Sequence, residues 1–343
     1  MRRLWLFLLL TIVLTACTEQ PSASVNLEEA SDPQSEQTLI IGAYGVAKDA
    51  LQLIVPEFQR EWKEQTGKTI QFQLSYEASG TQARAIAGGM EADVAVLAME
   101  GDVDKLANAD LIPAEWKARD PYAGMVTRSI VVIGTREGNP LGIQDWKDLT
   151  REDVDVLYPN PKTSGGAQWD INAIYGAGLM MAKEEGKEAE PYAKSLLESI
   201  HQRVISMDKS GRASMAAFEY GVGDAIITYE NELLARIKQG VNYEIVVPKY
   251  TIQIENPVVV VDRYVDKHGT REAAEAFVAF LRSERAQKLW IQAGFQPVVD
   301  IAGIEMTQER EGVFTIDDMG GWKHVRELIY SKRGVWYQVL AGL

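Results

Sequence analysis

Cysteine and histidine are nearly absent from this chain of 343 residues. Cys17 is the single cysteine, so no internal disulfide can form. The three histidines, His201, His268 and His324, have no metal-ligand spacing, and we expect neither a metal nor another cofactor. The chain also lacks the Gly-x-Ser-x-Gly and His-Glu-x-x-His motifs. These absences argue against the common hydrolase and metalloenzyme mechanisms.

The chain has fewer basic than acidic residues. The chain has 35 lysines and arginines against 49 aspartates and glutamates, a formal net charge of -14. Such a balance is unsuited to nucleic acid, which is bound by basic surfaces. It also repels anions at long range, so an anionic ligand would have to be held by short-range geometry.

Long apolar runs are absent except at the start of the chain. Leu4 to Val13 is apolar apart from Thr11 and follows Arg2 and Arg3. This run is too short to span a bilayer, which takes about 20 apolar residues. It predicts a signal peptide over residues 1–16, with an uncleaved signal anchor as the alternative.

The residues after this run indicate membrane attachment. Leu14-Thr-Ala-Cys17 resembles a bacterial lipobox, which implies a lipid on Cys17 and an extracytoplasmic location. An ordinary signal peptide with an incidental thiol is the alternative. Residues 17–37 are rich in Ser, Glu, Gln and Pro, and they predict a flexible tether.

The body alternates short apolar segments with amphipathic ones. We expect strands at 38–42, 69–75, 92–97, 130–134, 154–158, 204–207, 225–228, 243–247 and 258–261. We expect helices at 49–65, 79–88, 102–108, 164–182, 190–200, 212–220, 230–238 and within 270–293. This order predicts two α/β lobes with mostly parallel sheets and a ligand cleft between them.

One strand-to-helix turn carries the strongest chemical signal. In Pro159–Trp169, Thr163 or Ser164 can cap the following helix, and Gly165 and Gly166 leave its first N–H groups unobstructed. A helix start has unpaired donors and partial positive charge, so this turn can seat an anion without a charged side chain. The alternative is a capped helix that binds nothing.

Three further turns have related features. Ser79 is a potential N-cap, Gly211 can offer an N–H at a helix start, and Tyr229 can point its hydroxyl into a cleft. Each also has an ordinary structural interpretation, as a plain cap or as a core or rim aromatic. Arg212 is a candidate anion ligand, but a surface or inter-lobe position is the favoured interpretation.

The body from about Thr38 onward resembles the sulfate- and thiosulfate-binding proteins of ABC importers. The segment Asn160-Pro-Lys-Thr-Ser-Gly-Gly-Ala167 resembles the family signature. The supporting segments are 78–82, 91–94, 138–140, 221–224, 229–232 and 314–317. The resemblance implies a two-lobe, periplasmic-binding-protein-like (type II) α/β fold, a monomer that is not an enzyme, and an ABC permease as partner. The sulfate ligands that it implies are Ser79, Ser164, Gly165, Gly166, Gly211 and Tyr229.

Three positions depart from the family pattern. Gln168 stands where an arginine is usual, Tyr229 where an indole is usual, and Gly45 where an aspartate is frequent. An all-donor site suits sulfate, whereas hydrogen phosphate also needs an acceptor, which the Tyr229 hydroxyl could supply. Thiosulfate, molybdate and phosphate therefore remain alternative ligands. An anion-sensing receptor component and an extracytoplasmic hydrolase remain alternative functions.

The resemblance also suggests how the chain divides. We expect residues 38–125 and 254–343 to form the first lobe and residues 126–253 the second. The chain would cross between lobes near 122–130 and 247–257, and the lobes would close over the anion like a hinged clamp.

Overall fold

A computed structural model describes residues 36–304 and 310–342, which belong to one compact unit. The predicted signal peptide, Cys17 and almost all of the tether lie outside these residues. The strands are β1 (Glu36–Tyr44), β2 (Thr69–Glu77), β3 (Val94–Val96), β4 (Met125–Arg136), β5 (Val156–Leu157), β6 (Val204–Ser206), β7 (Ala225–Tyr229), β8 (Tyr243–Val246), β9 (Thr251–Val260) and β10 (Val313–Phe314).

Helices connect these strands. The α-helices are α1 (Lys48–Thr66), α2 (Ser79–Ala87), α3 (Glu100–Ala107), α4 (Gly165–Glu185), α5 (Ala189–His201), α6 (Gly211–Glu219), α7 (Glu230–Lys238), α8 (Asp262–His268), α9 (Arg271–Leu281), α10 (Glu284–Gln292), α11 (Gly321–Tyr330) and α12 (Val335–Ala341). Short 3-10 helices occupy Gly45–Ala47, Trp146–Thr150 and Asp317–Met319. The α/β fold class predicted from the sequence is confirmed.

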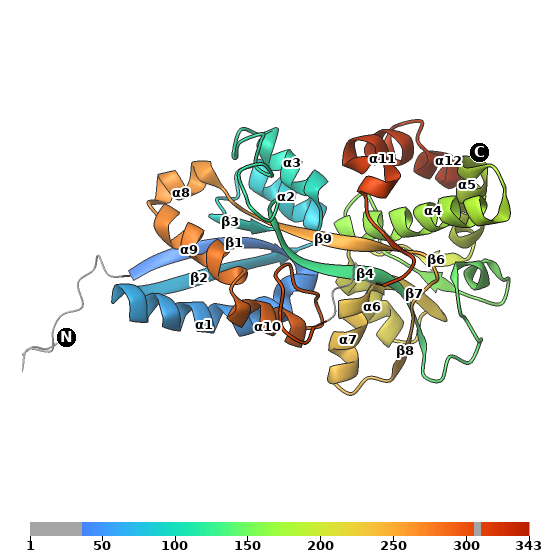
Figure 1. The fold of residues 1–343 in the computed structure, drawn as a ribbon, viewed down its shortest axis with the longest axis horizontal. Helices are drawn as coiled ribbons and strands as arrows, with labels where there is room; N and C mark the ends of the chain where they lie inside the picture. Colours follow the sequence, from blue (N-terminus) through green and yellow to red (C-terminus); the bar gives the residue numbers. More distant parts are fainter. Residues whose placement is uncertain (1–35, 305–309, 343) are drawn as a thin grey trace, which may run out of the picture. The chain divides into compact units, whose positions relative to one another are not determined.

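Two long strands join the two halves of the sheet. The strand order is β2-β1-β3-β9-β4-β7-β5-β6, with β8 and β10 pairing to β4 and β9. The first part of β4 pairs with β9 and its last part with β7 and β8, while β9 goes on to pair with β3. In Figure 1 both strands run across the middle of the body. They overlap the two segments, 122–130 and 247–257, that were expected to cross between lobes.

The expectation of mostly parallel sheets holds mainly away from these two strands, although β9 also pairs in parallel with β10. The β1–β2, β1–β3, β5–β6 and β5–β7 pairs are parallel. The β3–β9, β9–β4 and β4–β7 pairs are antiparallel. The physical reason is that β4 carries the chain into the second half of the sheet and β9 carries it back, so they run in opposite directions.

Helices cover both faces of the first half of the sheet. In Figure 1, α2 and α3 lie on one side of β1 and β3, whereas α1 and α10 lie on the other. Leu51, Ile54 and Phe58 recur on one face of α1 and are buried, as the helical period requires. Gly67 ends α1 in the left-handed conformation, with φ of 73°, which a glycine adopts without a steric penalty. The helix therefore ends one residue after the predicted end at residue 65.

Helix α4 is buried along most of its length, because neighbours surround it. It packs on α5 and on β9, and its Trp169 ring lies 4.9 Å from the ring of Trp322 in α11. The C-terminal α12 follows, with Trp336 5.1 Å from the His201 ring of α5. The last helices of the chain therefore pack on elements that the sequence assigned to the second lobe, although their own range, 254–343, was assigned to the first.

Candidate anion-binding cavity

A cavity of about 500 Å³ lies where several strands end and helices begin. Its wall includes the end of β1, the turns before α2, α4 and α6, and the junction of β7 with α7. Five of the six predicted ligand residues line it: Ser79, Ser164, Gly166, Gly211 and Tyr229. Turns separated by up to 150 residues in sequence therefore share one cavity.

Contacts between the turns hold this arrangement together. The Thr163 hydroxyl donates to the Lys209 carbonyl at 2.7 Å, which joins the turns before α4 and α6. The start of α2 also lies close to the turn before α4, because a Cβ on Gly80 would be 3.0 Å from the Thr163 carbonyl oxygen. The three helix starts thus approach one another through backbone and short side chains, as an amide-lined anion site requires.

The start of α4 matches the sequence prediction closely. Ser164 is the N-cap, and its Oγ accepts from the Ala167 N–H at 3.3 Å. Because the oxygen accepts there, its own O–H is free to donate to a ligand. A Cβ on Gly166 would lie 3.3 Å from Ser164 Oγ and 3.5 Å from the Tyr229 ring, so any side chain at 166 would enter this part of the cavity.

Gly165 has a different role from Gly166, because it does not line the cavity. A Cβ at this position would lie 2.9 Å from Asp102 Oδ2 and 3.1 Å from Met99 Cγ. The absence of a side chain at 165 therefore allows the start of α4 to pack closely on the β3–α3 connection.

The Ser79 hydroxyl is used inside the protein. Ser79 is the first residue of α2 and not its cap, a position that Ala78 holds. Its Oγ donates to Asp102 Oδ2 at 2.5 Å and accepts from the Ala98 N–H at 2.9 Å. At this turn the groups with no intrahelical partner are the first N–H groups of α2, which makes the backbone the candidate donor.

The start of α6 resembles that of α4. Ser210 is its N-cap and accepts from the Ala213 N–H at 3.2 Å, and Gly211 is the first helical residue. Both residues line the cavity. Sequence reasoning identified Gly211 but missed Ser210, although a serine before glycine at a strand-to-helix turn is a recognisable cap.

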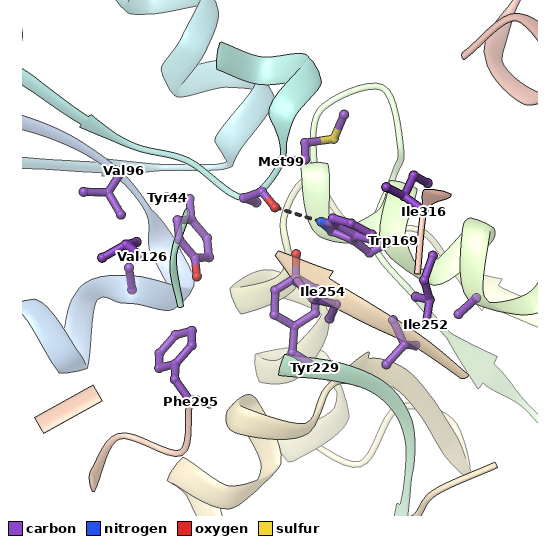
Figure 2. Packing of buried hydrophobic residues seen from close by; sticks show 14 of the residues in the cluster. Tyr44, Val96, Met99, Val126, Trp169, Tyr229, Ile252, Ile254, Phe295 and Ile316 are labelled. Carbon is purple, nitrogen blue, oxygen red and sulfur yellow. Dashed lines mark hydrogen bonds between the residues drawn. The ribbon is translucent and has the colours of Figure 1, made fainter. Parts of the chain in front are cut away.

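Tyr229 ends β7 and caps α7 with its backbone. Its side chain is buried, and its hydroxyl has no hydrogen-bond partner among the described residues. Burial raises the pKa of this hydroxyl well above its ordinary value, and the Asn256 side chain opposes that shift. Tyr44 reaches the same cavity from β1 (Figure 2). A buried, unpaired hydroxyl is an available donor for a ligand.

Arg212 is engaged with protein groups, in agreement with the interpretation that the sequence favoured. It donates to Asp49 Oδ2 at 2.8 Å and to the Val46 carbonyl at 3.3 Å. Its Nε lies 3.1 Å from Glu232 Oε1. Val46 and Asp49 lie in the helical segments after β1, and Glu232 lies in α7 after β7, so Arg212 bridges elements from the two halves of the body at the cavity.

Two of the positions that depart from the family pattern can now be placed. Gln168 lies outside the cavity wall and donates to the Pro161 carbonyl at 3.1 Å. Gly45 lines the cavity and faces the aliphatic part of Arg212. The Trp169 indole N–H donates to the Ala98 carbonyl at 2.8 Å (Figure 2), which ties α4 to the connection after β3.

Two buried carboxyl groups in the cavity wall were missed. Asp170 and Glu232 both line it and are almost fully buried. Burial raises the pKa of Asp170 well above its ordinary value, and burial raises that of Glu232 against the opposing effect of Arg212. Asp170 follows Gly166 by four residues, so helical spacing was the signal that could have identified it.

The described residues contain no group of His, Cys, Asp and Glu side chains placed to bind a metal. Over residues 36–304 and 310–342, no helix combines the length and apolar character needed to cross a bilayer.

A family model and individual known proteins match this chain over most of its length. Residues 39–296 match the family model described as bacterial extracellular solute-binding protein. The sulfate-binding protein of Synechococcus elongatus is 38% identical over 90% of this chain and 88% of its own length. The thiosulfate-binding protein of Pseudomonas aeruginosa is 32% identical over 88% of this chain and 92% of its own length.

A solved structure agrees with these relatives. The sulfate-binding protein SubI from Mycobacterium tuberculosis superposes with a TM-score of 0.77 at 31% identity, covering 86% of this chain and all of that one. The sequence match and the structural match cover the same α/β body. The chain therefore belongs to the bacterial extracellular solute-binding protein family.

Proposed function

We propose that this protein captures sulfate outside the cytoplasm and delivers it to the permease of an ABC importer. The observation that carries the proposal is the meeting of three helix starts, those of α2, α4 and α6, at one cavity. Each start supplies unpaired N–H donors and partial positive charge. The names of the relatives, sulfate- and thiosulfate-binding proteins, support the same ligand class.

The donors are assigned by position. Backbone N–H groups at Ser79, Gly166 and Gly211, the Ser164 hydroxyl and the Tyr229 hydroxyl would bind the anion. Gly165 would contribute through its backbone and by bringing α4 close to Asp102. No lysine or arginine is needed, and Arg212, which directly follows Gly211, is occupied by Asp49 and Glu232.

Binding would be coupled to closure of the two lobes. Strands β4 and β9 pass between the halves of the sheet, and they are the elements about which a hinge would act. Because α11 and α12 pack on α4 and α5, they would move with the second lobe. Closure excludes water and so strengthens each hydrogen bond to the anion.

We also propose how the protein is held at the membrane and how it acts on its ligand. A lipid on Cys17, added after removal of residues 1–16, would hold the protein at the outer side of the membrane as a monomer. The tether at 17–37 would let the body reach the permease. The protein would bind and release its ligand unchanged, so it would not be an enzyme.

Thiosulfate is the principal competitor, because one of the relatives is a thiosulfate-binding protein. Calorimetric titration of the purified full-length chain with sulfate, thiosulfate, molybdate and phosphate decides between them. The proposal predicts the tightest binding for sulfate and the weakest for phosphate, whose proton needs an acceptor. Binding of none of the four anions would reject it.

A further inference from the structure

Asp170 occupies an unusual place for a carboxyl group. It lies one helical turn after Gly166 on α4, so both residues share the face that lines the cavity. Its side chain is only 1% exposed. A charged group this deeply buried is costly unless it is paired.

No such pairing is present. Asp170 Oδ1 has no hydrogen-bond partner among the described residues. Other buried aspartates are satisfied: Asp93 accepts from the Ile40 N–H, from Thr270 and from His268, and Asp102 accepts from Ser79. Native proteins leave few buried polar groups unpaired, and an unpaired one in a cavity wall indicates a missing partner.

The groups that face Asp170 do not supply a counter-charge. Tyr158 after β5, Tyr229 at the end of β7 and Tyr330 of α11 are close enough for Asp170 to affect their pKa values, which burial raises well above the ordinary value. Further away, the Tyr158 hydroxyl contacts His201 of α5. The charged side chains that line the same cavity are Lys48, Asp49, Glu77, Lys209, Arg212 and Glu232.

We propose that Asp170 is a specificity-determining residue that, as a neutral carboxylic acid, donates a hydrogen bond to the bound oxyanion. The inference rests on the proposed capture of a tetrahedral dianion in this cavity. A neutral acid fits an all-donor site, whereas an ionised carboxylate about 4 Å from the ligand would repel it and weaken its binding by more than about 100-fold.

Burial supports this protonation state, because it raises the pKa of Asp170 well above its usual range. The direction of the pH effect follows. The complex retains the proton of Asp170, so sulfate affinity is constant below the pKa that Asp170 has in the anion-free protein. Above that pKa the affinity falls by up to about tenfold per pH unit. Sulfate itself stays a dianion across this range.

The test compares Asp170→Asn, which keeps a donor of the same shape, with Asp170→Leu, which has none. Calorimetry with sulfate is performed on the full-length protein from pH 5.5 to 9, with Asp300→Asn, at an exposed position outside the cavity, as the matched control. We expect Asp170→Asn to bind as wild type at pH 5.5 and to lose any pH dependence that the wild type shows. We expect Asp170→Leu to bind at least about tenfold more weakly, the loss of one hydrogen bond to a charged group.

Thermal unfolding without anion separates this role from a structural one. Because Asp170 is buried and unpaired, we expect Asp170→Leu to unfold at a higher temperature than wild type. Unchanged sulfate affinity in Asp170→Leu, an equal loss in both variants at pH 5.5, or a wild-type pH slope in Asp170→Asn would overturn the inference. Absence of sulfate binding by the wild type would instead reject the proposed function itself.

Discussion

Among single residues, Gly166 is the one whose missing side chain matters most for the ligand. A Cβ there would point between Ser164 and Tyr229, into the proposed anion seat. We expect Gly166→Asp to abolish sulfate binding, because a carboxylate about 4 Å from the anion costs about 4 kcal/mol per charge at an effective dielectric constant near 20. Calorimetry should show an affinity loss of more than about 100-fold.

Ala189→Asp is the matched control for this variant. Ala189 is exposed in the first turn of α5, outside the cavity, where a negative charge is favourable. We expect it to bind sulfate as wild type does. Retained affinity in a folded Gly166→Asp protein would show that this turn does not contact the anion.

Among single residues, the sequence best predicted those whose backbone role follows directly from their residue type. Glycines after a serine or threonine identified the start of α4, and Gly211 identified the start of α6. It was weakest for Asp170, Glu232 and the Ser79 hydroxyl. Their roles depend on burial and on partners such as Asp102 and Arg212, which are distant in sequence.

At the scale of elements, the serine caps of α4 and α10 make a matched pair. Ser164 accepts from Ala167 and Ser283 from Ala286, at 3.3 and 3.2 Å, so each cap satisfies one orphan N–H. We expect Ser164→Ala and Ser283→Ala each to lower the free energy of unfolding by about 1 kcal/mol. Denaturant unfolding at equilibrium measures both.

The two variants should separate in binding. Only Ser164 lines the cavity, and its free O–H is a proposed donor. We therefore expect Ser164→Ala to weaken sulfate binding by at least about tenfold, the value of one hydrogen bond to a charged group, and Ser283→Ala to leave it unchanged. Equal sulfate affinities in the two variants would show that Ser164 caps α4 and does not bind the anion.

The elements themselves were largely predictable. Apolar periodicity placed the expected strands and helices to within a few residues, and α7 begins and ends at the residues predicted. The long strands were underestimated: β9 runs from Thr251 and β4 from Met125 to Arg136. Each of these two strands pairs with different partners along its length. The full length of such a strand depends on tertiary pairing, which the local sequence pattern does not show. Three helices in the last part of the chain, α8, α11 and α12, were not predicted.

At the scale of the whole body, the account depends on two halves of one sheet that share β4 and β9. This connection brings turns from distant parts of the sequence to one cavity. The ion pairs of Arg212 and the Trp169–Ala98 hydrogen bond join elements from the two halves. The packing of the C-terminal helices on α4 and α5 was not predicted, because nothing in their local sequence specifies the neighbour that buries Trp322 and Trp336.

The measurement that tests the central claim most directly is a crystal structure with selenate, a tetrahedral dianion whose selenium is located by anomalous scattering. The account predicts one selenate in the cavity, with its oxygens about 3 Å from the backbone nitrogens of Gly166 and Gly211 and from Ser164 Oγ, and with no lysine or arginine in contact. A selenate bound by cationic side chains elsewhere, or a cavity that stays without it at saturating concentration, would contradict the account.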